Sequence, residues 1–168
     1  MSSSLKNLSD NELNTSIPNA KAMRFGIVVS EWNHEITLAL KEGAYTTLIQ
    51  HGAQPENILI SFVPGSYELT LGAQLQLENA NIDAVICLGC VIQGETRHFD
   101  FICDAVAQGI TNLNIKYNKP VIFGVLTPNN QQQAIDRAGG KHGNKGDEAA
   151  ATAIKMLALK HRLNAQAL

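Results

Sequence analysis

Two polar, glycine-containing segments carry the side chains of this chain that are best suited to chemistry. The first, residues 64–68, reads Pro-Gly-Ser-Tyr-Glu, and the second, residues 89–100, contains Thr96 and His98. Each follows an apolar run that is typical of a buried strand and leads into a stretch that we interpret as helix. Free backbone amides at a helix start, a hydroxyl, and an imidazole that exchanges protons near neutral pH suit an anionic substrate. These segments therefore predict a site that binds an anion and transfers protons.

The elements that must position these segments alternate along the chain. The expected strands span residues 23–30, 58–63, 82–88 and 120–127, and the expected helices span residues 34–50, 69–77, 98–114, 129–138 and 147–163. Residues 69–77 alternate partly like a strand, but we interpret them as helix because parallel strands require a crossover. The alternation predicts an α/β fold of three αβα layers with a four-stranded parallel sheet in the middle.

The four strand ends of such a sheet lie at one edge, where ligands bind. These ends are residues 30–33, 64–68, 90–98 and 127–128. Together they offer an aromatic plane, backbone amides, a carboxylate and a histidine, which suits a flat polar heterocycle with hydroxyl groups next to an anion. The chain has neither the phosphate-loop motif G-x-x-x-x-G-K-[ST] nor a G-x-G-x-x-G run after the first strand.

The N-terminal segment differs from the rest of the chain. Residues 1–21 are polar, lack clean periodicity and contain Pro18, which predicts an arm that is loosely ordered unless a neighbouring chain captures it. Residues 22–168 are expected to form one domain. A chain of 168 residues is long enough to bury roughly 70% of the surface that it exposes when unfolded.

The first expected helix, residues 34–50, has two apolar stripes. Asn33 precedes it and is expected to cap its free amides through the side-chain oxygen. The residues expected to face the sheet are Ile36, Ala39, Leu40 and Gly43. A second stripe, about 180° away by the helical repeat, consists of Leu38, Tyr45 and Ile49. Single exposed apolar residues are common, but this stripe favours a contact with another subunit.

Composition narrows the classes of partner. The chain has 13 basic and 15 acidic residues and a formal charge of -2, without a basic stripe, so nucleic acid is not expected as a partner. No run approaches the roughly 20 apolar residues that span a bilayer. The first residues also lack the apolar region of a secretory signal. The sequence therefore predicts a cytoplasmic protein without a membrane partner.

Two of the three cysteines, Cys87 and Cys90, have the C-x-x-C spacing of redox and zinc sites. Residues three apart on a strand point to opposite faces, however, and a structural zinc site needs four ligands. We therefore expect buried apolar cysteines and no metal.

Four ordered segments, residues 25–33, 63–68, 88–100 and 133–146, resemble the 6,7-dimethyl-8-ribityllumazine synthase family. The resemblance runs from residue 23 to the C-terminus, and four motifs in order are more specific than any one of them. It implies a flavodoxin-like fold and condensation of 5-amino-6-(D-ribitylamino)uracil with 3,4-dihydroxy-2-butanone 4-phosphate. Phosphate and water are released in this penultimate step of riboflavin biosynthesis, and the resemblance implies no metal or organic cofactor.

The resemblance also implies roles for residues that match the family's motifs. Trp32 would stack on the pyrimidine ring. The residues that would hold the ribityl chain are Ser66, Tyr67 and Glu68. The residues whose backbone would meet the ring edge are Cys90, Val91 and Ile92.

The remaining roles concern the phosphate and the proton. Glu95 and Thr96 would hold the phosphate at the helix start with help from Arg137, and His98 would move protons. Further positions of the family's site, which lies between neighbouring subunits, are matched by Phe123 and Lys145.

The resemblance further implies a homo-oligomer, a pentamer that could assemble twelvefold into an icosahedral shell, and riboflavin synthase as a candidate partner. The short turn at residues 139–146 resembles that of shell-forming members, whereas Pro18 removes a donor that the arm could use on a sheet edge. Two other classes stay open: a flavodoxin-like flavin carrier that uses the same crevice, and a structural container.

Overall fold

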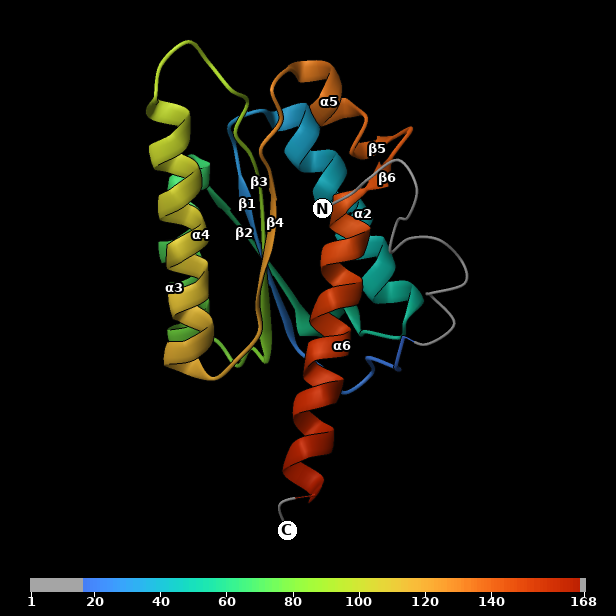
Figure 1. Cartoon of the computed structure of the whole chain (residues 1–168). Helices are drawn as coiled ribbons and strands as arrows, with labels where there is room; N and C mark the ends of the chain where they lie inside the picture. The colour runs from blue at the N-terminus through green and yellow to red at the C-terminus, as the bar shows by residue number, and fades with distance from the viewer. Residues whose placement is uncertain (1–16, 167–168) are drawn as a thin grey trace.

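A parallel sheet of four strands forms the middle layer of the chain (Figure 1). The computed structural model describes residues 17–166. The strands are β1 (Phe25–Ser30), β2 (Ile58–Val63), β3 (Ala84–Cys90) and β4 (Val121–Leu126), and their order is β2-β1-β3-β4. The predicted parallel sheet is confirmed. Most of the predicted arm, residues 1–16, lies outside the described residues.

Two pairs of helices cover the two faces of the sheet, as Figure 1 shows. One face is covered by α2 (His34–Gln50) and α6 (Lys145–Gln166), and the other by α3 (Leu69–Asn79) and α4 (His98–Tyr117). The short elements are η1 (Pro55–Asn57), η2 (Ser66–Glu68), α5 (Gln131–Ile135) and a hairpin of β5 (Ala138–Gly140) and β6 (Gly143–Asn144). This confirms the three-layer αβα, flavodoxin-like fold.

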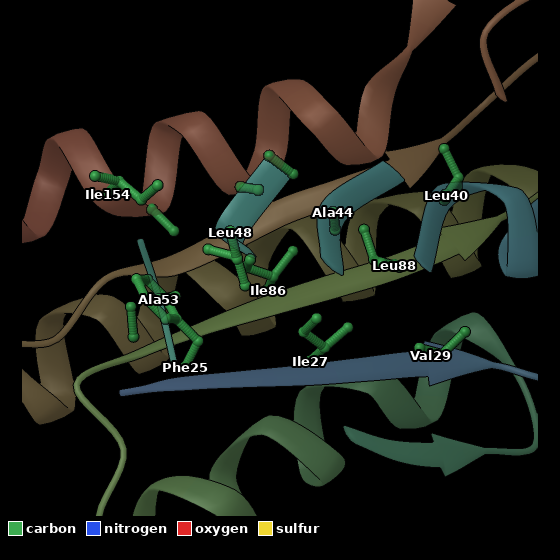
Figure 2. Close-up of a cluster of buried hydrophobic side chains, with 14 of the residues drawn as sticks. Phe25, Ile27, Val29, Leu40, Ala44, Leu48, Ala53, Ile86, Leu88 and Ile154 are labelled. Atoms are coloured by element: carbon green, nitrogen blue, oxygen red, sulfur yellow. The ribbon is translucent and has the colours of Figure 1, made fainter. Parts of the chain in front are cut away.

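The alternation of side chains along the strands builds two cores. Phe25, Ile27 and Val29 of β1 pack toward α2 and α6, where they meet Leu40 and Leu48 of α2 (Figure 2). The intervening Val28 packs toward α3 and α4. Because both faces of β1 and β3 are buried, these strands are apolar along most of their length, as is typical of strands in parallel sheets.

The strand order opens a crevice between β1 and β3. The connection from β1 runs through α2 to the edge strand β2, and the next connection returns through α3 to the other side of β1. The loops that leave β1 and β3 therefore lead to helices on opposite faces of the sheet. This arrangement is the topological switch point, at which ligands bind in open α/β sheets.

Some predicted bounds need correction. The third strand spans Ala84–Cys90 instead of residues 82–88, because β4 continues to pair with it as far as Cys90. The last helix begins at Lys145 instead of residue 147, because the Asn144 side chain accepts a hydrogen bond from the Gly146 amide. The segment predicted as a plain turn, residues 139–146, contains most of the β5–β6 hairpin.

The surroundings of α2 also differ from the prediction. Asn33 has a left-handed backbone (φ 57°) and makes no side-chain cap; instead its Nδ2 donates to the Cys90 carbonyl. Ile36 and Leu40 are buried as expected. Ala39, however, lies beside the end of β6, where its carbonyl accepts a hydrogen bond from the side-chain amide of Asn144. The residues of the second stripe, Leu38, Tyr45 and Ile49, are half-buried, and their subunit contact stays a prediction.

No helix within residues 17–166 has both the length and the apolar character that crossing a membrane requires.

Candidate active site

A cleft of about 790 Å³ lies at the carboxyl ends of β1, β2 and β3. Eight of the predicted site residues line it, namely Trp32, Ser66, Tyr67, Glu68, Cys90, Val91, Ile92 and His98. Asn33, Gly65 and Ile102 complete the lining. The switch point of the sheet thus brings together residues from three separate predicted segments, and we call this space the first cleft.

Trp32 presents a flat apolar face at the first cleft. The indole is 73% exposed within the single chain, although its backbone is held by a hydrogen bond from its amide to the Pro64 carbonyl. A Cβ at Gly65 would lie 3.4 Å from Cδ1 of the indole, an ordinary van der Waals distance, so the ring lies alongside the backbone at Gly65. An exposed aromatic face on a fixed backbone suits stacking on a planar ligand.

Two serine hydroxyls that lie close to Gly89 of β3 have unused hydrogen-bonding capacity. Ser30 is fully buried and Ser66 is 5% exposed, and neither Oγ has a partner among residues 17–166. A Cβ at Gly89 would lie 2.6 Å from the Ser66 Oγ, so only glycine admits this hydroxyl so close to β3. Buried hydroxyls are nearly always paired. The Ser66 hydroxyl therefore has hydrogen-bonding capacity that no described residue uses.

The start of α4 forms one wall of the first cleft. His98 is the first residue of this 20-residue helix and is exposed within the single chain. The Thr96 hydroxyl accepts a hydrogen bond from the His98 amide at 3.4 Å. Glu95 and Thr96 do not line the cleft itself but lie in the exposed loop that leads into the helix. The free amides and the positive end of the helix dipole make this loop suitable for an anion.

The three other predicted site residues line a second cleft of about 600 Å³ beside the edge strand β4. These residues are Phe123, Arg137 and Lys145. The Arg137 guanidinium donates to the Gln133 carbonyl, and the Lys145 ammonium lies 2.5 Å from the Glu148 carboxylate. The two clefts share no lining residue. Within one chain, the guanidinium therefore does not join the indole and the imidazole.

The pattern of burial excludes a redox role for the C-x-x-C pair. Cys87 packs in the core beneath α3 and α4, whereas Cys90 packs in the core beneath α2 and α6, so the two thiols point to opposite faces. Burial raises the pKa of both thiols to about 12. A reactive cysteine needs a lowered pKa and access to solvent. The expectation of buried apolar cysteines is confirmed.

Comparisons with known proteins place the chain in a family. The family model described as 6,7-dimethyl-8-ribityllumazine synthase matches residues 22–161. A curated relative of that name from Cytophaga hutchinsonii is 64% identical over 158 residues, which are 94% of this chain and 98% of the relative. The chain belongs to the 6,7-dimethyl-8-ribityllumazine synthase family.

Other curated relatives agree with this membership. The proteins of the same name from Phocaeicola vulgatus and Parabacteroides distasonis are 55% and 56% identical over 163 and 157 residues. These matches cover 97% and 94% of this chain and 96% and 98% of the relatives. The resemblance inferred from four motifs is therefore confirmed at the level of the family.

Two residues at the clefts were missed by the sequence analysis as members of a site. Glu148 lines the second cleft and pairs with Lys145 across the first turn of α6. The predicted helix began only at residue 147, so the spacing of the two residues was not recognised as a helical pair. Asn33 lines the first cleft, but its bond to Cys90 joins residues that are far apart in the chain. No local pattern could have identified that contact.

Proposed function

We propose that this chain catalyses the reaction for which its family is named. It condenses 5-amino-6-(D-ribitylamino)uracil with 3,4-dihydroxy-2-butanone 4-phosphate to 6,7-dimethyl-8-ribityllumazine, with loss of phosphate and water. The observation that carries the proposal is the meeting of Trp32, Ser66 and His98 in one cleft at the switch point of the sheet. An aromatic face, an unused buried hydroxyl and a proton carrier at one crevice suit a planar, hydroxylated substrate.

In this proposal the first cleft binds the pyrimidine. The Trp32 indole stacks on the ring, and the backbone of residues 90–92 at the end of β3 meets its edge. The ribityl hydroxyls bond to Ser66 and Glu68 and pack along Tyr67. Ser66 supports this role because its buried hydroxyl lacks a partner within residues 17–166. A ligand hydroxyl would complete its hydrogen bonding and remove the cost of leaving it unpaired.

The phosphate substrate is assigned to the start of α4. Glu95 and Thr96 lie in the loop at this helix end, where backbone amides stabilise an anion. His98 moves the protons that imine formation requires. Arg137 assists the departure of phosphate through charge-assisted hydrogen bonds. Much of the rate enhancement then comes from holding two reactants together.

The complete site requires two copies of the chain, with the second cleft of one copy facing the first cleft of the next. Two features support this: the clefts share no lining residue, and both edge strands expose apolar side chains. On β2 these are Leu59 and Phe62, which are 41% and 50% exposed, and on β4 it is Phe123, which is 42% exposed. A contact of this kind joins two different surfaces of the chain, and repeated contacts form a ring when the rotation between neighbours closes.

We infer a pentameric ring and favour twelve such rings in an icosahedral shell, with residues 1–21 as an arm and residues 22–168 as the catalytic domain. The proposal also includes a cytoplasmic location and riboflavin synthase as a candidate partner. Light scattering on purified protein separates a pentamer, a decamer and a shell by mass. A monomer would contradict the shared site.

The decisive assay mixes both substrates with purified protein and follows the fluorescence of the lumazine product. Turnover that depends on both substrates is expected. A yellow protein that binds flavin but does not convert the two substrates would favour the flavin carrier instead. A shell without turnover would leave the container as the function.

A further inference from the structure

A hydrogen bond crosses the crevice between β1 and β3 and holds its two sides together. The Nδ2 of Asn33, which follows β1, donates to the carbonyl of Cys90, the last residue of β3, at 2.9 Å. The loops that leave these neighbouring strands lead to helices on opposite faces of the sheet. This bond therefore ties the two loops at the point where they diverge.

The backbone of Asn33 turns sharply at the same place. Its φ of 57° and ψ of 46° are left-handed, a conformation that residues with a Cβ rarely adopt and that asparagine tolerates better than most. Its carbonyl accepts hydrogen bonds from the amides of Ile36 and Thr37 and so begins α2. The turn leaves the preceding Trp32 largely exposed at the first cleft, while Asn33 is half-buried beside it.

We propose that Asn33 is a positioning residue that sets the width of the first cleft. Its left-handed backbone directs the Trp32 indole, and its amide fixes that indole relative to the end of β3. A flat heterocycle enters only if the indole face and the β3 backbone keep a fixed separation. The inference rests on the proposed function, because it assigns the pyrimidine to the first cleft.

The two properties of Asn33 can be separated by substitution. Glycine adopts the left-handed conformation without strain but lacks the side-chain amide, so Asn33→Gly removes the bond to Cys90 and keeps the turn. Aspartate has nearly the same shape and tolerates the same backbone, but Asn33→Asp replaces the donor with a carboxylate that repels the Cys90 carbonyl. If Asn33 positions the cleft through its bond to Cys90, both variants should weaken binding of the aminopyrimidine to a similar extent.

The chain supplies a matched control for the backbone effect. Asn118, at the carboxyl end of α4, has the same left-handed conformation with a φ of 48°. It precedes β4 at the opposite end of the sheet from the first cleft. Asn118→Gly therefore makes the same exchange of residue types in the same conformation, away from the first cleft.

The experiment measures the KM for each substrate and kcat in these three variants of the full chain. Asn33→Gly and Asn33→Asp are expected to raise the KM for the aminopyrimidine about three- to tenfold, the usual worth of one hydrogen bond. The KM for the butanone phosphate should stay within about twofold, because the phosphate is held at the start of α4. Asn118→Gly should change neither KM.

A second measurement does not depend on turnover. Trp32 is the only tryptophan of the chain, so the decay of its fluorescence anisotropy reports this indole alone. Both Asn33 variants should show more fast local rotation of the indole than the wild type, and Asn118→Gly should match the wild type. Circular dichroism and light scattering on the same samples confirm that fold and assembly are retained.

The inference is overturned if both Asn33 variants keep the wild-type KM for the pyrimidine and the wild-type anisotropy decay. An equal rise of both KM values, or the same change in Asn118→Gly, would indicate a general loosening of the fold and would also overturn it. A wild type without turnover would refute the proposed function instead. In that case the anisotropy comparison alone decides whether Asn33 holds Trp32.

Discussion

Ser66 and His98 lie at the same cleft but differ in burial and in their hydrogen bonding. The Ser66 hydroxyl is buried and unpaired within the described chain, while the His98 side chain is exposed at the mouth of the same cleft. In the proposed function, Ser66 therefore holds a ligand group in a fixed place, and His98 exchanges protons with the substrate. Because Ser66 is assigned to binding and His98 to proton transfer, we expect the loss of His98 to affect mainly the rate of the reaction.

Removing the imidazole should slow the reaction without abolishing it. His98→Ala is expected to lower kcat by about 10²-fold, because general acid–base catalysis contributes that much and holding the reactants together persists. The rate of lumazine formation measures the effect. The matched control is His161→Ala, since His161 is exposed near the end of α6 and should not affect the rate. Complete loss of activity in a folded His98→Ala protein would mean that the imidazole does more than move protons.

The thiols should differ in reactivity. Burial raises the pKa of Cys87 and Cys90 to about 12, whereas Cys103 is only half-buried. Burial and the nearby carboxylates of Asp104 and Asp100 raise the pKa of Cys103 as well. A thiol reagent at pH 8 should therefore label Cys103 alone, and slowly, in the native protein.

The unfolded protein should yield all three thiols, and Cys103→Ser should remove the native reaction. Fast labelling of Cys87 or Cys90 in folded protein would contradict their burial.

At the scale of elements, the contact between α2 and α6 depends on a close approach of the two backbones. Gly146, in the first turn of α6, lies against α2 so closely that a Cβ there would be 1.9 Å from the Leu40 carbonyl oxygen. The same contact places the half-buried Asp147 beside Gly43, and partial burial, together with the charge of Glu148, raises the pKa of the Asp147 carboxyl. The start of α6 also carries Lys145, so this contact positions one wall of the second cleft.

A methyl group at this contact should be costly. Gly146→Ala is expected to lower the free energy of unfolding by about 2–3 kcal/mol, because backbone atoms must move to admit the Cβ. Urea denaturation measures the change. The control is Gly94→Ala, since a Cβ at Gly94 meets nothing within 4 Å and should leave stability nearly unchanged. Equal stability of the two variants would contradict the close approach.

At the scale of the whole molecule, the separation of the two clefts allows a test of the shared site. His98 lines the first cleft and Arg137 the second. If neighbouring copies complete each other's sites, two variants with strongly reduced activity can restore activity when they assemble together. Co-expression of His98→Ala with Arg137→Ala should return about a quarter of the wild-type activity, because random pairing joins two intact half-sites at that frequency.

The control for this mixture is a pair of variants in the same cleft. His98→Ala co-expressed with Trp32→Ala should show no recovery, because every interface then lacks one of the two groups. Activity is measured on co-purified assemblies that carry two different tags. No recovery of activity in the first mixture would mean that His98 of one copy and Arg137 of its neighbour do not act in one shared site.

The periodicity of the sequence was sufficient to predict the helices and strands and to locate the crevice at the edge of the sheet. Runs such as residues 58–63 and the repeat of residues 34–50 predicted a strand and a helix with the bounds that the structure has. Once four strands are parallel, their carboxyl ends must share one edge. The resemblance to the family's motifs added the predicted site residues, because the residue types at positions 64–68 and 89–100 are specific to the family when they occur together.

The sequence could not decide contacts that depend on the order of the strands and the approach of distant segments. Asn33 was expected to cap α2, but β3 lies beside β1 and offers the Cys90 carbonyl, 57 positions away, to the same side chain. The same holds for Arg137, which the motifs grouped with His98 but which β4 and α6 place at another cleft. Local patterns report which face of an element is buried; tertiary packing alone decides which distant group that face meets.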